Sequence, residues 1–235
     1  KMILSIIIPC FNEENTILEI LNKVNIQKKF LNIQIIISDD GSTDNTISLL
    51  KNNSHLYDKL IENKINCGKG AAIISAIPYL KGSIIIIQDA DLEYDPNDYK
   101  NLIKPIISHK CSVVYGSRVL NKRRYKNKNF TSLFRVFSNH VLTIISNLFN
   151  RQSLTDAHTC YKVFSEDVFS KIFFKEKGFN FCPEATTKIS NLGIKIFEVP
   201  ISYNGRTYKQ GKKIKFIDGL EAILTIIKYK FFITK

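Results

Sequence analysis

The stretch IIIIQDAD, residues 84–91, carries the strongest fold signal in the chain. Four consecutive isoleucines predict a strand at residues 83–88, because β-branched side chains favour an extended backbone. A strand that is apolar at every position is covered on both faces, which indicates a parallel sheet with helices on either side. Asp89 and Asp91 follow directly, at the strand end where open α/β sheets bind ligands.

Similar segments extend this pattern along the first half of the chain. Apolar, β-branched runs predict further strands at residues 4–8, 33–38 and 112–115. Helical spacing of apolar residues predicts helices at residues 14–27, 44–51, 70–80 and 97–108. Strands that alternate with helices are typical of α/β proteins, so we predict a Rossmann-like, mostly parallel sheet flanked by helices.

The second half has a different character. Residues 121–129 (NKRRYKNKN) predict a basic loop, and an apolar-rich helix is expected to follow it at residues 130–150. Strands are predicted near residues 161–164 and 195–200, and helices at residues 166–174, 183–192 and from residue 217. We therefore expect one α/β domain whose C-terminal region is mainly helical.

Composition limits the class of protein. A chain of 235 residues that is 44% hydrophobic suits one α/β domain. The five cysteines are odd in number and contain no C-x-x-C pair, which favours neither a disulfide framework nor a zinc site and indicates a cytoplasmic protein. The four histidines show no metal-ligand spacing, and only His158, close to Asp156, merits a test.

Charge indicates an acidic partner. Lys and Arg total 34 against 21 Asp and Glu, a formal net charge of +13, so nucleic acid, anionic lipid or a phosphorylated substrate would be attracted. No apolar run reaches the roughly 18 to 20 residues of a membrane span. We also find no secretory signal, so any contact with a membrane is expected at its surface or through another chain.

Carboxylates follow more than one predicted strand. Asp89 and Asp91 are spaced so that both can reach a hard divalent cation, which is commonly shared with substrate phosphates. Asp39 and Asp40 follow another strand, and a capped turn explains Gly41 and Ser42 but not two adjacent carboxylates. A nucleic-acid-binding module would explain the charge of the chain but not these carboxylates, which repel phosphate unless a cation intervenes.

Five ordered motifs together resemble a known family. They are PCFNE (residues 9–13), DDGSTD (39–44), GKG (68–70), QDADL (88–92) and GSR (116–118). Their order and approximate spacing are similar to those of family-two glycosyltransferases, and within that family to the polyprenyl-phosphate (dolichyl-phosphate) mannosyl- and glucosyltransferases. Downstream residues agree with this resemblance: Asp156, CYKVF (160–164), Glu184, Arg206 and GKK (211–213).

The resemblance implies a fold and an activity. The fold would be GT-A, with a nucleotide-sugar-binding half at residues 1–120 and an acceptor-binding half with a membrane-facing helix at residues 121–235. The enzyme would be an inverting, metal-dependent glycosyltransferase that moves a hexose from UDP- or GDP-hexose to a lipid, foremost polyprenyl phosphate. Open alternatives are a diacylglycerol or other hydroxyl acceptor and, in a different class, the nucleic-acid-binding module. A nucleotidyltransferase would place a Gly-rich basic loop where this chain has residues 9–13.

Donor-binding roles also follow from the resemblance. The nucleoside would be held by residues at two strand ends, namely Pro9, Asn12, Glu13, Asp39 and Asp40, with Gly68 and Lys69 beside the base. Asp89 and Asp91 would bind Mg²⁺ or Mn²⁺ on the diphosphate, with Ala90 against the ribose. The cations Arg118, Arg206 and Lys213 would face the diphosphate or the acceptor phosphate. Residues 206–213 (RTYKQGKK) look more like glucosyl-type relatives than mannosyl ones, so the donor sugar stays open.

The need for a general base depends on the acceptor. A phosphate monoester is already anionic near neutral pH, whereas a hydroxyl must lose its proton to a positioned carboxylate. Glu184 is the first candidate for such a base and Asp156 the second. A purely structural role remains open for both residues, as a carboxylate at the start of a helix for Glu184 and as a capping residue for Asp156.

The helix expected at residues 130–150 has a broad apolar face beside the basic residues 122–128. This combination is typical of helices that lie in a bilayer interface with cations on anionic headgroups, although packing on the catalytic core is the alternative. We expect a peripheral protein on the cytoplasmic face of a membrane. The aromatic and basic C-terminal segment could be a second contact, or could dock a membrane protein or another copy of the chain.

Overall fold

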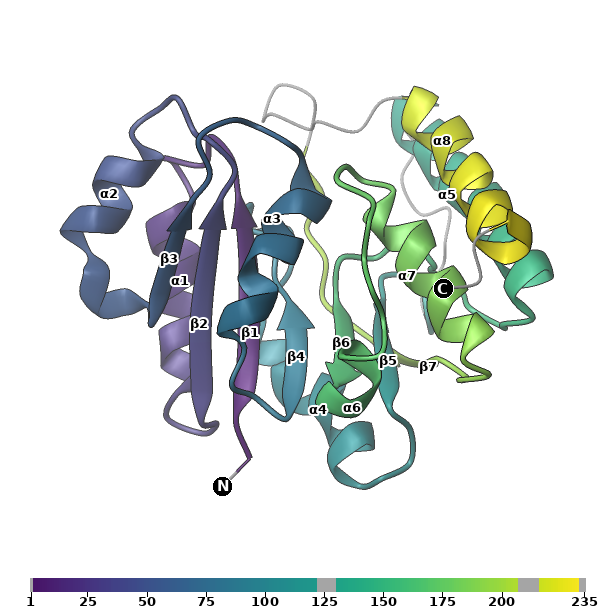
Figure 1. Ribbon diagram of the computed structural model, residues 1–235, viewed down its shortest axis with the longest axis horizontal. Helices are drawn as coiled ribbons and strands as arrows, with labels where there is room; N and C mark the ends of the chain where they lie inside the picture. Colours follow the sequence, from purple (N-terminus) through teal and green to yellow (C-terminus); the bar gives the residue numbers. More distant parts are fainter. Residues whose placement is uncertain (1, 122–129, 207–215, 233–235) are drawn as a thin grey trace.

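The computed structural model describes residues 2–121, 130–206 and 216–232. Seven strands form one sheet in the order β3-β2-β1-β4-β6-β5-β7. Their bounds are β1 (Leu4–Cys10), β2 (Ile33–Asp39), β3 (Lys59–Glu62), β4 (Ile84–Ile87), β5 (Val113–Ser117), β6 (Lys162–Ser165) and β7 (Phe197–Pro200). Figure 1 shows this sheet running across the whole molecule.

The sheet is mostly parallel, as predicted. Strands β1, β2, β3 and β4 are parallel neighbours, and β7 runs parallel to β5, while β6 is antiparallel to both β4 and β5. The register pairs Cys10 with Asp39 and Ile7 with Ile87. The loops that follow β1, β2 and β4 therefore meet at one edge of the sheet, where the predicted carboxylates lie.

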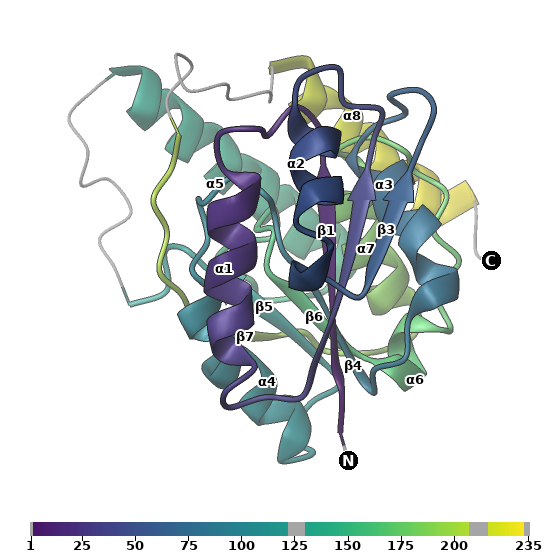
Figure 2. The same ribbon diagram turned by 90° about the vertical axis from the view of Figure 1, so that its left-hand side faces the viewer.

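Helices cover both faces of the sheet. Helices α1 (Ile17–Gln27) and α4 (Tyr99–Ile107) lie on one face, and α3 (Lys69–Ala76) and α7 (Phe181–Asn191) on the other (Figures 1 and 2). Every residue of β1 and β2 is buried as a result. This double cover explains the unbroken isoleucine runs, because each fully buried apolar side chain contributes about 1.5–3 kcal/mol.

Two elements differ from the sequence prediction. Strand β3 was missed because it is a short edge strand, KLIE, which carries a charge at each end, has no buried residue and ends on the exposed Glu62. Helix α6 (Glu166–Phe169) ends well before the predicted residue 174. The chain leaves the helix there so that Phe174 can enter the core, with its ring 5.3 Å from that of Phe169 and 4.8 Å from that of Phe181.

The helical C-terminal region lies at the end of the sheet away from β3. Helices α5 (Phe130–Asn150) and α8 (Phe216–Ile227) run side by side there, and η5 (Lys228–Phe232), a π-helical turn, continues α8 (Figure 1). The predicted helix at 130–150 is therefore confirmed, whereas most of the predicted basic loop, residues 122–129, lies outside the described residues. Helix α2 (Thr46–Asn52) covers the opposite end.

The two predicted halves share the sheet. Strands β6 and β7 come from the second half, and β6 lies between β4 and β5 of the first. The division into a donor half and an acceptor half stays a prediction. Within the described ranges, none of the helices combines the length and the apolar character that crossing a membrane demands.

Candidate active site

The carboxylates that follow β4 lie at the sheet edge formed by the ends of β1 and β2. Asp89 forms an ion pair with Lys69, the first residue of α3. Asp91 turns back on its own loop, where its Oδ1 accepts a hydrogen bond of 3.1 Å from the backbone N–H of Glu93. Asp89, Asp91 and Glu93 are therefore close together on the loop that follows β4, which we call the carboxylate loop. Lys69 is the cation that contacts Asp89.

The electrostatics of this loop favour a cation. Burial, together with the charges of Asp89 and Glu93, raises the pKa of Asp91 to about 7, against the lowering effect of the Glu93 N–H. Burial also raises the pKa of Asp39, although Ser42 opposes this by donating bonds of 2.8 Å from its N–H and 2.5 Å from its hydroxyl. Negative charge at this edge is thus only partly compensated by the protein.

Glu93 is a site residue that the sequence reasoning missed. Its Oε1 accepts a 2.5 Å hydrogen bond from the backbone N–H of Arg206, and its Oε2 accepts one of 3.0 Å from the hydroxyl of Tyr203. Its backbone carbonyl accepts the N–H of Asn204 at 2.9 Å. The available signal was its spacing, since Glu93 continues the alternation of Asp89 and Asp91. Glu93 brings residues 203–206 to the carboxylate loop.

Arg206 reaches the same edge from the far end of the chain. Its Nη2 lies 2.8 Å from Glu13 Oε2 and its Nη1 lies 3.2 Å from Glu13 Oε1, a bidentate pair that is largely buried. Thr16 supports Glu13 with a hydroxyl bond of 2.8 Å. Burial lowers the pKa of Arg206, but Glu13, Asp91 and Glu93 together raise it above its ordinary value. The structure therefore brings two predicted residues, Glu13 and Arg206, together beside Asp91.

Asp40 holds the turn that carries Lys69. Its carboxylate accepts backbone N–H bonds of 3.0 Å from Cys67 and 2.6 Å from Gly68, and it is almost fully buried. Gly68 has φ of +101°, and a Cβ there would stand 2.7 Å from the carbonyl oxygen of Lys177. Only glycine fits such a position. The carboxylate of Asp40 is thus engaged by backbone, with little surface left for a nucleoside.

The other predicted nucleoside contacts are divided between surface and core. Asn12, at φ of 53°, joins the first loop to the second, because its Oδ1 accepts the N–H of Thr43 at 2.8 Å and its own N–H donates to Ser42 at 2.9 Å. Pro9 is buried within β1, and Ala90 packs in the core with 3% of its surface exposed. Ala90 therefore offers a ribose only a small area.

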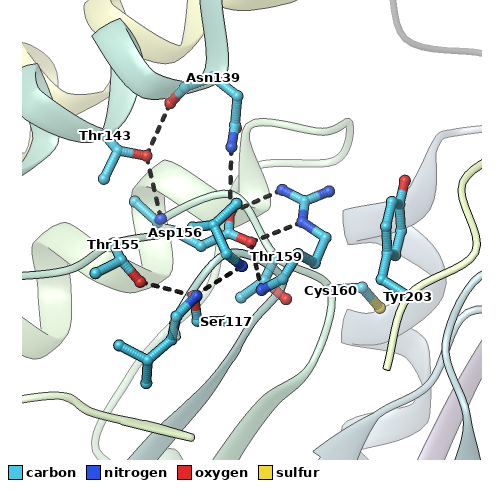
Figure 3. A network of polar contacts seen from close by, with 12 residues as sticks. Ser117, Asn139, Thr143, Thr155, Asp156, Thr159, Cys160 and Tyr203 are labelled. Carbon is cyan, nitrogen blue, oxygen red and sulfur yellow. Dashed lines mark hydrogen bonds and ion pairs between the residues drawn. The ribbon is translucent and has the colours of Figure 1, made fainter. Parts of the chain in front are cut away.

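Arg118 and Asp156 form a largely buried ion pair outside this loop. Figure 3 shows Asp156 within its network of polar contacts. The Nε and Nη2 of Arg118 donate to Asp156 at 2.7 Å each, and its backbone N–H donates at 3.1 Å. Asn139 adds a bond of 3.3 Å from α5. Burial raises the pKa of Asp156, but Arg118 outweighs this and brings it to about 2. A carboxylate held in this way is a poor proton acceptor near neutral pH, so the geometry does not support Asp156 as a general base.

His158 lies close to this pair. Burial lowers its pKa to about 4, helped by Lys162, so the ring is neutral at physiological pH. Its Nε2 is buried and has no hydrogen-bond partner among the described residues.

Glu184 is placed away from the carboxylate loop and is fully engaged. It accepts backbone N–H bonds of 2.8 Å from Lys175 and 2.9 Å from Glu176, and it pairs with Lys188 at 2.8 Å. The side chain has no exposed surface. The structure thus gives Glu184 the contacts of a structural carboxylate, not those of a base open to substrate. Lys213 lies outside the described residues.

Known proteins resemble this chain in sequence and in fold. The chain is 27% identical over 246 residues to a dolichyl-phosphate β-glucosyltransferase of Trichomonas vaginalis, covering 97% of this chain and 73% of that protein. It is 28% identical over 244 residues to the UDP-N-acetylglucosamine–dolichyl-phosphate N-acetylglucosaminyltransferase of Methanococcus voltae, covering 96% and 95%. Among solved structures, glucosyl-3-phosphoglycerate synthase of Mycobacterium tuberculosis superimposes with a TM-score of 0.70 at 17% identity, covering 96% of this chain and 77% of that one.

The match to the family described as glycosyl transferase family 2 covers residues 5–173, from the first strand to beyond α6. That range contains the carboxylates that follow β2, those that follow β4, and the Arg118–Asp156 pair. The solved neighbour confirms the predicted GT-A fold, and the family match confirms the predicted class of enzyme. The chain belongs to glycosyltransferase family 2.

Proposed function

We propose that this glycosyltransferase moves a hexose, with inversion, from a nucleotide-diphosphate sugar to polyprenyl phosphate at the cytoplasmic face of a membrane. The observation that carries the proposal is the meeting of Asp89, Asp91 and Arg206 at one edge of the sheet. Two relatives named for a dolichyl-phosphate acceptor match this chain over nearly its whole length. The donor base and the sugar stay open between UDP- and GDP-hexoses.

The residues of the carboxylate loop fit a divalent ion. Asp89 and Asp91 would hold Mg²⁺ or Mn²⁺, which neutralises charge on the leaving diphosphate when bound. The described residues contain no group of three or more His, Cys, Asp or Glu able to hold a metal alone. An ion that completes its coordination with substrate phosphates needs no such group. The M. tuberculosis neighbour was solved with Mn²⁺ and UDP.

Fixed cations of the chain would act on the same diphosphate. Lys69 contacts Asp89, and Arg206 lies beside Asp91, so both can meet negative charge that develops as the nucleotide leaves. Glu13 orients the guanidinium of Arg206 through its bidentate pair. In this proposal the chain binds and orients the donor, and the charged edge supplies the electrostatic stabilisation.

The contacts of Asp156 and Glu184, the two candidates for a general base, support a phosphate acceptor rather than a hydroxyl. Asp156 is committed to Arg118, and Glu184 is committed to two backbone N–H groups and Lys188. A hydroxyl acceptor requires a carboxylate that can take its proton, whereas a phosphate monoester attacks as an anion. The engaged state of both carboxylates therefore supports polyprenyl phosphate as the acceptor.

The outer surface of α5 supports docking on a lipid bilayer. This helix buries polar side chains, with Thr143 and Ser146 at 2% and 1% exposure, and exposes apolar ones, with Ile144 at 54% and Leu148 at 76%. The arrangement is the reverse of that expected for a helix facing water. The inward polar face bonds the loop before β6, for example through the paired hydrogen bonds of Asn147 and Leu154 at 2.8 and 2.9 Å.

Neighbouring elements extend the apolar surface. Exposed residues of α5, α8 and η5 form what we call the apolar face: Phe137, Val141, Ile144, Leu148, Leu220, Leu224, Phe231 and Phe232. A patch of this kind on a chain of net charge +13 suits a bilayer with anionic headgroups. We place it on the cytoplasmic face, where the five free cysteines would stay reduced.

A transfer assay tests the acceptor and the donor together. The protein is incubated with UDP- and GDP-hexoses, Mn²⁺, and vesicles that contain either polyprenyl phosphate or diacylglycerol, and the lipid that gains a hexose is identified by mass. We expect product on polyprenyl phosphate. Product on diacylglycerol alone would support the hydroxyl alternative. Stabilisation against heat by DNA, without stabilisation by UDP or GDP and Mn²⁺, would support the binding module.

Vesicle sedimentation tests the apolar face. We expect the protein to sediment with vesicles rich in phosphatidylglycerol, and the double variant Leu148→Ser, Leu224→Ser to lose about tenfold in affinity because two apolar side chains no longer enter the bilayer. Phe30→Ser, at an exposed residue (61%) beyond the end of α1 and outside the apolar face, serves as the control. If the double variant instead dissociates an oligomer and leaves vesicle binding unchanged, the face is an interface between copies of the chain.

A further inference from the structure

We infer that Glu184 is a positioning residue for donor binding. It fixes the loop of residues 175–178, which seats the turn of residues 67–70 and so places Lys69 beside Asp89. The inference rests on the proposed function, because it assigns the loop a part in holding the nucleotide diphosphate. It replaces the role of a general base with a role that acts through Lys69.

The grip of Glu184 on the loop is direct. One carboxylate oxygen takes the N–H of Lys175 at 2.8 Å and the other takes the N–H of Glu176 at 2.9 Å. Lys188 balances the charge at 2.8 Å and also donates to the backbone carbonyl of Phe173. A buried carboxylate with this set of donors is costly to disturb, because every bond it makes replaces hydration lost on folding.

The loop of residues 175–178 packs directly against Gly68 and Gly70. A Cβ at Gly70 would stand 2.0 Å from the carbonyl oxygen of Glu176, and one at Gly68 would stand 2.7 Å from that of Lys177. The N–H of Ala71 donates to the same Lys177 carbonyl at 2.9 Å. The two backbones therefore touch with no side chain between them, where the chain before α7 comes up to the first turn of α3 (Figure 1).

Each partner in this contact has a second support. Asp40 holds the turn from the side of the sheet through the N–H groups of Cys67 and Gly68. Glu176 anchors the loop to η5, since its Oε1 accepts bonds of 2.7 Å from Lys228 and 2.8 Å from the hydroxyl of Tyr229. The turn is thus held between Asp40 and the loop, which limits the positions that Lys69 can take.

Lys69 is the residue through which this contact would affect the donor. Its ammonium pairs with Asp89, one of the two carboxylates assigned to the metal, and both side chains are largely buried. A shift of the loop of residues 175–178 would move Lys69, so its positive charge would compensate less of the negative charge on the carboxylates and the diphosphate. The expected defect is weaker donor binding with the chemical step preserved.

Glu184→Gln tests this role, because glutamine keeps the shape but turns an NH₂ group toward one backbone N–H. We expect the Kd of the nucleotide diphosphate with Mn²⁺, measured by calorimetry, and the donor KM to rise about tenfold, while kcat changes by less than about threefold. The pH profile of kcat should not change. A fall in kcat of about a hundredfold or more with an altered pH profile would identify a base and overturn the inference, as would unchanged binding.

Gly70→Ala disturbs the same contact from the opposite side. We expect a similar rise in Kd, and a double variant with Glu184→Gln whose effect on log Kd is clearly less than the sum of the single effects. Full additivity would overturn the inference. Glu19→Gln, which removes a carboxylate from an exposed pair with Lys23, is the matched control.

The outcomes separate this inference from the proposed function. If the unaltered protein binds neither UDP nor GDP with Mn²⁺, the proposed function fails and the inference fails with it. If the unaltered protein binds and the variants bind equally well, the inference alone fails. Should Glu184→Gln not fold, Gly70→Ala and Tyr229→Phe, which removes one bond to Glu176, decide the question by the same Kd and kcat measurements.

Discussion

Two regions of the molecule bury a carboxylate near a strand end, and they shift its pKa in opposite directions. At the carboxylate loop after β4, burial and two like charges raise the pKa of Asp91 to about 7. In the network beside β5, Arg118 brings the pKa of Asp156 to about 2. The difference shows that burial alone does not define a role. A carboxylate with a complete set of protein partners holds the fold, whereas one without such partners is ready for a ligand.

The largest effect is expected from breaking the paired region. Asp156→Asn leaves the largely buried guanidinium of Arg118 without its counter-charge, so the free energy of unfolding should fall by about 3–5 kcal/mol. Denaturant unfolding measures this loss. Asp167→Asn, which removes one partner of an exposed pair with Lys171, should change stability by less than about 1 kcal/mol. Equal stability of the two variants would contradict the assignment of Asp156 to the fold.

The carboxylate loop after β4 should respond through activity. Asp91→Asn removes a proposed metal ligand, so we expect kcat/KM for transfer to fall by about 10²–10³-fold while circular dichroism shows an intact fold. Full turnover by this variant would remove Asp91 from the mechanism. Asp167→Asn again serves as the control, with activity unchanged.

The pH dependence of stability should differ in sign between the regions. The pKa of Asp91 in the folded protein lies above its ordinary 3.8, so the contribution of Asp91 to folding stability weakens as pH rises from about 4 to about 7. Asp91→Asn should therefore be more stable than the unaltered protein above pH 7, by about 1–3 kcal/mol. The folded pKa of Asp156 lies below 3.8, so its contribution is present above about pH 4 and is lost as pH falls through about 2. Thermal unfolding across this range measures both slopes; a less stable Asp91→Asn at pH 8 would contradict the first.

The smallest effect concerns Tyr203, which touches both regions. Its hydroxyl donates to Glu93 at 3.0 Å, and its ring lies 5.1 Å from the guanidinium carbon of Arg118. Tyr203→Phe keeps the ring and removes the hydroxyl, so we expect the donor Kd to rise by about two- to fivefold, equivalent to one hydrogen bond, with little change in stability. Calorimetry with a nucleotide diphosphate and Mn²⁺ measures the Kd. A loss of stability without a change in Kd would place Tyr203 with the structural region.

Much of the fold could be predicted because its signals are local. A short run of isoleucine bounded by polar residues predicts a doubly covered strand, and the helix of residues 130–150 shows its period within its own length. Strand β3 and the early end of α6 were missed because edge pairing and the burial of Phe174 depend on distant partners. For the helix of residues 130–150 the sequence left two alternatives open, a bilayer interface or packing on the core, because it shows that a helix has two faces but not which one the core accepts.

The sequence by itself determined the family, the mostly parallel sheet and the position of Asp89 and Asp91 at the edge of the sheet where the strands β1, β2 and β4 end. The tertiary structure decided which carboxylates are committed elsewhere: Asp156 to Arg118, and Glu184 to the loop before α7. It also decided that Arg206 meets Glu13 across 193 residues of chain, and that Glu93 belongs to the site. The physical reason is that charge and burial are set by whatever folds against a side chain, and those neighbours are rarely its neighbours in sequence.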